Sequence, residues 1–207
     1  MKIVDHAYPT GRLNVLGANE RTVEFFSQTT ASSYAEIGVY RGETALEIAN
    51  QLDGRGHLHL FDYEDRLCEV ERLLHAAGHE NVTLHPNSRR LLDSYNWSLM
   101  QLLAKHRGPI FDYVFLDGAH TWAHDALAFL LIDRLLLPGG YIDFDDYTWT
   151  LRRSPSMNPD VFPEVEQLYS DDQIDTAQVA LVVDLLVRLD PAYEEVVENK
   201  IFRKGGA

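Results

Sequence analysis

Short apolar runs alternate with longer amphipathic stretches along the chain, and turn-forming residues separate the two kinds of segment. Five runs have the length and apolar content of buried strands, namely residues 33–38, 57–62, 82–85, 112–117 and 141–145. Strands that alternate with helices are typical of a parallel sheet with crossover helices on its faces. The pattern therefore predicts a doubly wound α/β fold.

The stretches between these runs have a helical spacing of apolar residues. Residues 43–52, 65–77 and 94–106 each place apolar side chains on one stripe, as crossover helices do. Residues 122–137 form the most apolar stretch, and we expect this helix to stop at Pro138-Gly139-Gly140, before the fifth strand.

Two irregular flanks surround the predicted site. Residues 19–28 predict a short amphipathic helix outside the sheet, within an N-terminal segment, residues 1–30, that we interpret as a cap over the active site. Residues 148–163 contain three prolines and no regular apolar spacing. Such a segment suits neither a long helix nor a central strand, and we interpret it as a mobile substrate loop.

The C-terminal part predicts one more helix and a hairpin. Residues 177–189 have helical spacing, with Thr176 as a plausible cap, and residues 193–204 split at Glu198-Asn199 into two alternating apolar stretches. The hairpin would finish the sheet with an antiparallel edge. The complete prediction is one domain, residues 1–207, with a mostly parallel seven-stranded sheet and an antiparallel C-terminal hairpin.

Composition narrows the choice of partners. At 207 residues and 45% hydrophobic content, the chain suits one domain with a full core. Its formal net charge of −14 argues against nucleic acid or an anionic membrane as a partner, because either needs a basic surface. No apolar run approaches the roughly 18 residues of a membrane span, and the N-terminus lacks the apolar stretch of a secretion signal. We therefore expect a cytoplasmic protein.

A glycine-rich turn follows the first predicted strand. The segment has an acidic residue, Glu36, then Gly38 and Gly42, and it opens onto a predicted helix. Such a turn places backbone N–H groups and a positive helix end beside a ligand. A dinucleotide fingerprint would need glycines at positions 38, 40 and 43, but the chain has Tyr40 and Glu43, so a nicotinamide or flavin enzyme is the weaker interpretation.

The spacing acidic-x-Gly-x-x-x-Gly resembles the first motif of class I S-adenosylmethionine-dependent methyltransferases, whose fold is Rossmann-like. The resemblance implies that residues 36–42, with Tyr40 and Gly42, bind the cofactor S-adenosylmethionine. It implies that Gly38 lets the backbone approach the methionine part and that Glu36 points toward its ammonium group.

Two later strand ends fit the same cofactor. Asp62 ends the second strand, where a carboxylate can accept both ribose hydroxyls, and Tyr63 would flank the adenine. After the third strand, Asn87 and Ser88 occupy the position where the family contacts the adenine edge. Asp117, at the end of the fourth strand, completes the predicted cofactor-binding set.

Three aspartates predict a metal site. Asp117 closes the fourth strand and Asp145-Asp146 closes the fifth, and these strands are neighbours in this fold. Crowded carboxylates repel one another unless a proton or a cation offsets their charge, and Mg²⁺ prefers oxygen ligands. Period 2 places Asp143 on the same face as Asp145, so it is a further candidate for the acidic site. The alternative is structural, with a helix cap at Asp117 and a solvated loop at Asp145-Asp146.

These positions also resemble the metal-dependent O-methyltransferases of the catechol and macrocin types, which carry an Asp after the fourth strand and Asp-Asp or Asp-Asn after the fifth. Here Asp117, Asp145 and Asp146 match as metal ligands. No lysine follows the fourth strand to serve as the base, so His120 would take that role with Asp117, and His124 could share its wall. The alternative for these histidines is a surface pair at a helix start.

Three functions remain open. The leading one is divalent-metal-assisted O-methylation of a hydroxyl on a sugar or small natural product. The second keeps the cofactor and methylates nitrogen or oxygen without a metal. The third is a non-catalytic S-adenosylmethionine-binding domain that uses residues 148–163 for a protein partner. A homodimer could form through the hairpin edge or the N-terminal segment.

Overall fold

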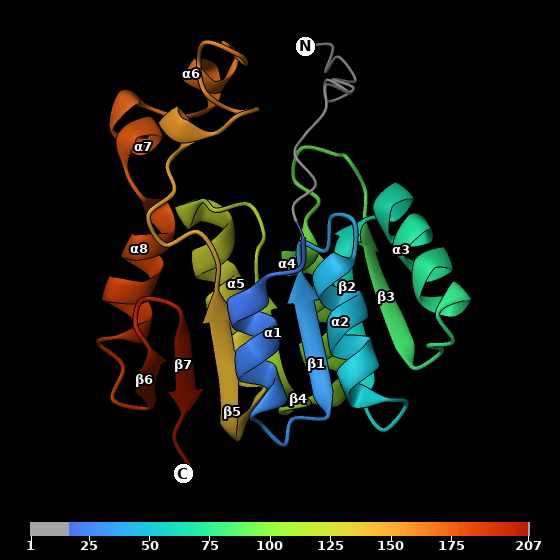
Figure 1. The fold of residues 1–207 in the computed structure, drawn as a ribbon. Helices are drawn as coiled ribbons and strands as arrows, with labels where there is room; N and C mark the ends of the chain where they lie inside the picture. The colour runs from blue at the N-terminus through green and yellow to red at the C-terminus, as the bar shows by residue number, and fades with distance from the viewer. Residues whose placement is uncertain (1–16, 207) are drawn as a thin grey trace.

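The computed structural model describes residues 17–206. Within them, seven strands form one sheet in the order β3-β2-β1-β4-β5-β7-β6 (Figure 1). Strands β1 to β5 are parallel, and β7 is antiparallel to both β5 and β6. The strands are β1 (Ser33–Ile37), β2 (His57–Tyr63), β3 (Val82–Asn87), β4 (Phe111–Leu116), β5 (Leu136–Phe144), β6 (Tyr193–Val197) and β7 (Ile201–Lys204). The predicted Rossmann-like α/β fold, with its antiparallel C-terminal hairpin, is confirmed.

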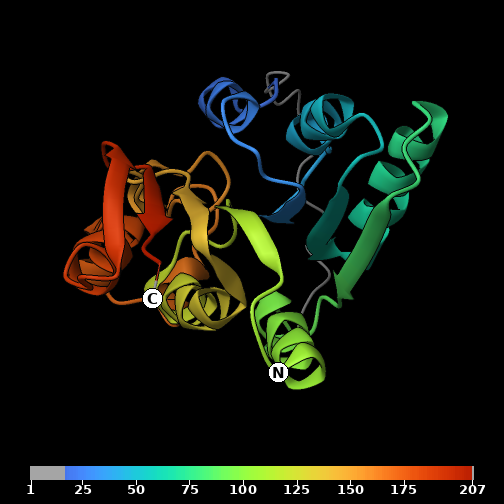
Figure 2. The same cartoon turned by 90° about the horizontal axis from the view of Figure 1, so that it is seen from below.

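Helices cover both faces of this sheet (Figure 2). One face carries α1 (Glu20–Ser27), α2 (Glu43–Leu52) and α3 (Glu64–Ala76). The other carries α4 (Tyr95–His106), α5 (Trp122–Leu135) and α8 (Gln178–Val182), which continues as the π-helical turn η2 (Val183–Val187). Among residues 17–206, no helix combines the length and the apolar character that crossing a membrane requires.

Alternate residues of the central strands form the two layers of the core. In β4, Tyr113 and Phe115 pack in the cluster with α1, α2 and α3, whereas Val114 and Leu116 pack in the cluster with α4 and α5. Strands that are buried on both faces read as near-continuous apolar runs. That is why the apolar runs located the five parallel strands so well.

The fifth strand begins earlier than the sequence pattern predicts. It includes Pro138-Gly139-Gly140, which the pattern assigns to the end of the preceding helix. The register between β4 and β5 shifts between Phe111 and Tyr113, so this segment is an irregularity within the strand. A Cβ on the second glycine would lie 2.8 Å from the carbonyl oxygen of Asp112, so glycine allows the two strands to approach here.

Residues 148–175 form a small lobe beyond the end of β5, at the top of Figure 1. It contains the 3-10 turn η1 (Leu151–Arg153) and the short helices α6 (Val165–Leu168) and α7 (Asp171–Asp175). Leu151, Val165 and Ile174 are buried together in a cluster of their own. The predicted substrate loop, residues 148–163, is irregular as expected and packs around this cluster. Its contact with an acceptor stays a prediction.

The C-terminal elements agree with the prediction except at one cap. β6 and β7 form the predicted hairpin, and Asn199 in its turn has a φ of 56°. Thr176 does not cap α8, because Ala177 occupies the cap position. The Thr176 hydroxyl instead donates to the carbonyl oxygen of Asp172, 2.6 Å away in α7. The predicted cap was wrong because the preceding helix uses that side chain.

The predicted helix 19–28 is α1, and it packs on the sheet. The ring of Phe26 lies edge-on to Tyr34 and Tyr113, at centroid distances of 5.5 Å and 5.2 Å. Only the amino end of α1, at Asn19, reaches the edge of the sheet where the site residues lie. Residues 1–16 of the predicted cap segment are outside the described residues.

Candidate active site

The predicted site residues come from the ends of adjacent strands. The carboxyl ends of parallel strands meet at one edge of a sheet, and ligands of such folds bind where the strand order reverses, here between β1 and β4. This is the upper edge of the sheet in Figure 1. The residues at this edge are Glu36, Gly38, Tyr40 and Gly42 from β1 and its turn, Asp62 and Tyr63 from β2, Asn87 and Ser88 from β3, and Asp117, Asp145 and Asp146 after β4 and β5.

The turn after β1 depends on two glycines. Gly38 has a φ of 90°, and a Cβ there would lie 1.8 Å from the carbonyl oxygen of Asp117. Gly42 has a φ of 80°, and a Cβ there would lie 2.8 Å from Cγ1 of Val70. Only glycine adopts this conformation without strain, and at Gly38 a side chain would also displace the backbone of Asp117. Gly38 therefore brings the turn directly against the residue that ends β4.

The Asp62 carboxylate accepts hydrogen bonds from the backbone of β2 and of the turn after β1. Its Oδ2 accepts a hydrogen bond from the Tyr40 N–H at 2.8 Å, and its Oδ1 accepts one from the Tyr63 N–H at 2.7 Å. Arg66 lies 3.5 Å from Oδ1. These contacts fix the position of an acceptor-only group beside the glycine turn. This is the arrangement that a ribose needs for its two hydroxyls.

Glu36 is a buried carboxyl group beneath the same turn. It is 2% exposed, and it accepts a hydrogen bond from the Tyr34 hydroxyl at 2.9 Å. Burial raises the pKa of Glu36 to about 8, and the hydrogen bond from Tyr34 opposes this shift. An ammonium group beside Glu36 would favour its ionised form. The contact with the methionine ammonium that the family resemblance implies for Glu36 stays a prediction.

The predicted adenine side is rich in arginine. The Arg89 guanidinium lies 4.3 Å from the ring centre of Tyr63, and it forms an ion pair with Asp65 at 2.8 Å. Asn87 is buried, whereas Ser88 donates through both its N–H and its hydroxyl to Asp93, at 2.8 Å and 2.6 Å. Ser88 therefore shapes the loop after β3, and its contact with the adenine stays a prediction.

Asp117, His120 and Asp146 come together after β4 and β5. His120 Nε2 lies 3.5 Å from Asp117 Oδ1 and 3.6 Å from Asp146 Oδ2. The three side chains offer ligand atoms within 4.8 Å of one another. His120 and Asp146 have φ values of 54° and 57°, a left-handed conformation that is uncommon outside glycine but that Asp and His adopt more often than most residues.

Burial and like charges raise the pKa values of this group. Burial raises the pKa of Asp117 well above its usual range, and the charges of Asp145, Glu36 and Asp146 raise it further, whereas Lys200 opposes the shift. Burial also raises the pKa of Asp146, although the nearby His120 opposes the shift. Both carboxyl groups are therefore harder to ionise than an ordinary aspartate.

A lysine that the sequence analysis missed lies beside these carboxylates. Lys200, from the turn before β7, is 5% exposed, and its Nζ lies 2.8 Å from Asp143 Oδ1 and 3.7 Å from Asp145 Oδ1. Asp145 also accepts a hydrogen bond from Asn19 Nδ2 at 3.0 Å. No local pattern in the hairpin turn indicated that Lys200 points inward.

Asp143 and His124 do not join the acidic group. Asp143 is fully buried and accepts a hydrogen bond from the Tyr113 hydroxyl at 2.7 Å, in addition to its ion pair with Lys200. His124 Nδ1 lies 3.0 Å from Oγ1 of Thr121. Both residues support the framework of the site.

Tyr95 is a second residue that the sequence analysis missed. Its hydroxyl donates to the buried Asp125 and accepts a hydrogen bond from the Ala119 N–H at 3.2 Å. A Cβ on Gly118 would lie 2.8 Å from the same hydroxyl oxygen. Tyr95 therefore holds the segment that carries Asp117 and His120 against α4 and α5.

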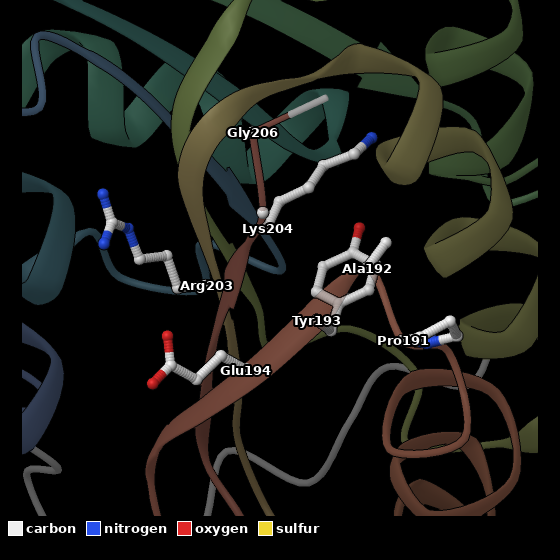
Figure 3. A pocket seen from close by; sticks show the side chains of 8 residues that line it. Pro191, Ala192, Tyr193, Glu194, Arg203, Lys204 and Gly206 are labelled. Atoms are coloured by element: carbon white, nitrogen blue, oxygen red, sulfur yellow. The ribbon is translucent and has the colours of Figure 1, made fainter.

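A cavity of about 330 Å³ lies elsewhere, at the C-terminal hairpin (Figure 3). Two of its polar side chains already have a partner in α5, because the Tyr193 hydroxyl donates to Asp133 at 2.9 Å and Lys204 forms an ion pair with the same residue. The lining residues are Pro191, Ala192, Tyr193, Glu194, Arg203, Lys204, Gly205 and Gly206. This cavity is at the amino end of β5, remote from the predicted site.

Comparisons with solved structures show that the fold is shared by methyltransferases with different acceptors. The O-methyltransferase TomG from Streptomyces achromogenes, in complex with S-adenosylmethionine, superposes with a TM-score of 0.62 at 16% identity, covering 94% of this chain and 84% of that chain. The O-methyltransferase from Bacillus cereus, in complex with SAH, gives 0.61 at 17% identity, covering 96% and 84%. An rRNA methylase from Streptococcus thermophilus gives 0.54 at 15% identity, covering 94% and 100%.

The family itself follows from the sequence. No curated protein matches the chain significantly. A family model described as a methyltransferase domain matches residues 35–147, which is more than half of the chain and spans the turn after β1, Asp62, Asp117 and Asp146. The chain belongs to this methyltransferase family, and it is a class I S-adenosylmethionine-dependent methyltransferase.

Proposed function

We propose that this enzyme transfers the methyl group of S-adenosylmethionine to a hydroxyl of a sugar or small natural product, with a divalent cation at Asp117 and Asp146. The contact between Gly38 and Asp117 carries this proposal. Gly38 packs against the backbone of Asp117, so the turn assigned to the methyl donor adjoins the acidic group. Donor and acceptor sites that adjoin in this way allow in-line transfer between bound reactants.

The residues of the cofactor side bind and orient S-adenosylmethionine. Asp62, held by the N–H groups of Tyr40 and Tyr63, accepts the ribose hydroxyls. Glu36 accepts a hydrogen bond from the methionine ammonium, whose positive charge favours the ionised form of the carboxyl group. Holding both reactants in a reactive geometry can supply several of the roughly 7–11 kcal/mol attributed to proximity effects.

The donor set of the acidic group fits a divalent cation. Asp117 and Asp146 offer carboxylate oxygens, and His120, in the same group, is not a ligand in this proposal because its imidazole must accept a proton. Oxygen ligands suit Mg²⁺ and Mn²⁺. When bound, such a cation lowers the pKa of an acceptor hydroxyl and orients it. Asp145 is engaged by Lys200 and Asn19, and we propose that it supports the site through charge.

His120 receives the acceptor proton in this proposal. Its Nε2 lies between Asp117 and Asp146, and its ring lies 5.2 Å from that of Trp149, at the start of the predicted substrate loop. A carboxylate beside an imidazole stabilises the protonated ring after transfer. The acceptor hydroxyl loses its proton to His120 as its oxygen gains the methyl group.

Calorimetry and a transfer assay test the proposal together. We would titrate wild-type protein, Asp62→Ala, Asp146→Asn and the exposed control Asp160→Asn with S-adenosylmethionine and separately with Mn²⁺. Asp62→Ala should lose cofactor binding, and Asp146→Asn should weaken Mn²⁺ binding by on the order of 10–100-fold while it retains the cofactor. A panel of hydroxyl acceptors, followed by formation of S-adenosylhomocysteine, should show activity that a chelator removes and Mn²⁺ or Mg²⁺ restores.

Each failure has a separate meaning. Methyl transfer that persists in the presence of a chelator would overturn the proposed role of the metal. It would leave metal-independent N- or O-methylation as the function. Cofactor binding with no transfer to any hydroxyl or amine would favour a non-catalytic domain with a protein partner.

A further inference from the structure

Asn19, at the amino end of α1, contacts both the helix that follows the glycine turn and the acidic group. Its Oδ1 caps α1 by accepting hydrogen bonds from the Thr22 N–H at 3.2 Å and from the Thr22 hydroxyl at 3.1 Å. Its backbone N–H donates to Oγ1 of Thr44 at 2.9 Å, in the first turn of α2. Its Nδ2 donates to Oδ1 of Asp145 at 3.0 Å, directly after β5. One residue therefore joins three elements.

These contacts give asparagine a role that other capping residues do not fill. The end of the amide that faces the Thr22 N–H must accept a hydrogen bond, and the end that faces the Asp145 carboxylate must donate one. Aspartate and serine cap helices about as well as asparagine does. However, aspartate would turn a carboxylate oxygen toward Asp145, and the shorter serine uses its hydroxyl for the cap. Capping alone does not require asparagine at position 19, whereas the bond to Asp145 does.

The rest of α1 is anchored, so Asn19 is held in place. Helices α1 and α2 lie side by side on one face of the sheet (Figure 2). Nε2 of Gln51, near the end of α2, donates to the carbonyl oxygen of Val23 at 3.1 Å. The ring of Phe25 lies edge-on to that of Tyr141 on β5, with centroids 5.2 Å apart. Helix α1 is thus fixed to both α2 and β5.

Asp145 connects β5 to the candidate metal ligand Asp146. Its N–H donates to the carbonyl oxygen of Leu116, the last residue of β4, at 3.1 Å. Its Oδ1 lies 3.7 Å from Nζ of Lys200, in addition to the hydrogen bond from Asn19. Asp146 follows after one peptide bond, in a left-handed conformation with a φ of 57°. A displacement of Asp145 therefore also displaces Asp146.

We propose that Asn19 is a positioning residue that couples the cofactor turn to the acidic group. Cofactor binding orders the turn and the first turn of α2, and the hydrogen bonds from Asn19 to Thr44 and Asp145 extend this order to the end of β5. Coupling of this kind is reciprocal, so a cation in the acidic group should also raise the affinity for the cofactor. The inference rests on the proposed function for the role of the acidic group.

The first test needs no metal. Hydrogen exchange of the full chain is measured by mass spectrometry with and without saturating S-adenosylhomocysteine. In wild type, the ligand should slow exchange in α2 and also in residues 145–149. Asn19→Ser and Asn19→Asp keep the helix cap and lose the donor. Both variants should bind S-adenosylhomocysteine with nearly unchanged affinity and keep the protection of α2, but they should lose most of the protection of residues 145–149.

The second test measures the coupling directly. Mn²⁺ is titrated by calorimetry with and without saturating S-adenosylhomocysteine, and the ratio of the two affinities is compared between variants. The ratio is the readout because the added carboxylate of Asn19→Asp itself attracts a cation. Wild type should bind Mn²⁺ roughly fivefold or more tightly when the cofactor site is filled, and both Asn19 variants should bring this ratio close to one.

Asn81 provides the matched control. Its Nδ2 donates to the carbonyl oxygen of Gly54 at 2.7 Å, and it precedes β3 at the opposite edge of the sheet. Asn81→Asp therefore removes a comparable hydrogen bond and should retain both the protection of residues 145–149 and the affinity ratio of wild type.

The outcomes separate this inference from the proposed function. Equal exchange of residues 145–149 in wild type, Asn19→Ser and Asn19→Asp would overturn the inference. So would a loss of S-adenosylhomocysteine binding in Asn19→Ser at an unchanged urea midpoint, because Asn19 would then serve the cofactor turn alone. Protection that depends on Asn19 in a protein that does not bind Mn²⁺ would support the coupling and overturn the proposed metal.

Discussion

Asp62 and Asp117 each end a central strand at the same edge of the sheet, yet the protein surrounds them differently. Asp62 is held by two backbone N–H groups from its own and the adjacent strand end. Asp117 lies among other carboxyl groups, and burial and their charges raise its pKa well above the usual range. The proposed cofactor side therefore holds its carboxyl group in place through backbone contacts, whereas on the proposed acceptor side burial and like charges disfavour the ionisation of Asp117.

The contacts on the two sides also differ in their sequence separation. The partner of Asp62 in the turn after β1, Tyr40, is 22 residues away, whereas Asn19 donates to Asp145 from 126 residues away. Lys200, from the C-terminal hairpin, compensates Asp143 and Asp145. Variants that remove one contact from either side should show how far the two sides are independent.

The largest effect is expected for Lys200→Met. The variant leaves Asp143 buried without its cation, and breaking a buried ion pair in this way costs about 3–5 kcal/mol. Urea denaturation measures the loss. The exposed pair between Arg152 and Asp175 is the control, because Arg152→Met removes only a solvent-exposed ion pair and should leave the urea midpoint nearly unchanged. The double variant Lys200→Met/Asp143→Asn should recover part of the stability, and a double variant as unstable as Lys200→Met would contradict this account.

The next largest effect is expected for Gly38→Ala. This variant should lower the free energy of unfolding by about 2–5 kcal/mol, because the alanine is strained in the left-handed conformation and its Cβ is overpacked against Asp117. It should also abolish measurable S-adenosylmethionine binding in calorimetry, because the turn moves away from β4. Gly54 has a similar φ of 71°, and a Cβ there would meet nothing within 4 Å, so Gly54→Ala isolates the strain alone. Equal losses in the two variants would show that the contact with Asp117 is unimportant.

Tyr95→Phe is expected to lower the free energy of unfolding by about 1–3 kcal/mol, because it leaves Asp125 and the Ala119 N–H without their shared partner. The segment that carries Asp117 and His120 should loosen, so methyl transfer should fall more than cofactor affinity. Tyr193→Phe removes a comparable hydroxyl contact, with Asp133, remote from the site. If both variants transfer methyl groups equally well, Tyr95 does not position the acceptor side.

The sequence predicted the fold well, because buried strands read as apolar runs. Gly38, Gly42 and Asp62 follow such runs directly, so the sequence also places them at one edge of the sheet, while their contact with the cofactor stays a prediction. Lys200 could not be found in this way, since a lysine in a hairpin turn is ordinarily solvated and only the register of β7 beside β5 carries it inward. The start of β5 was missed because Pro138-Gly139-Gly140 is also a helix-stop signal, and the strand irregularity overrides it.

The smallest expected effect is the pH dependence of cofactor affinity, and it tests Glu36 directly. The pKa of Glu36 is raised to about 8 in the folded protein, so the folded state binds this proton more tightly than the unfolded chain, and Glu36 lowers stability as pH rises from 4.5 toward 8. Binding an ammonium group requires the carboxylate, and below about pH 8 binding therefore releases a proton. Affinity should fall by up to about tenfold for each pH unit below 8. Above that pH the amino group of the ligand loses its own proton, with a pKa of about 8, so the profile should have a maximum.

Calorimetry in buffers of different ionisation enthalpy counts the released proton, and Glu36→Gln should remove both the release and the slope. A wild-type profile that is flat between pH 6 and 8 would mean that Glu36 does not meet the ammonium group, and the cofactor side would then depend on Asp62 and the glycine turn.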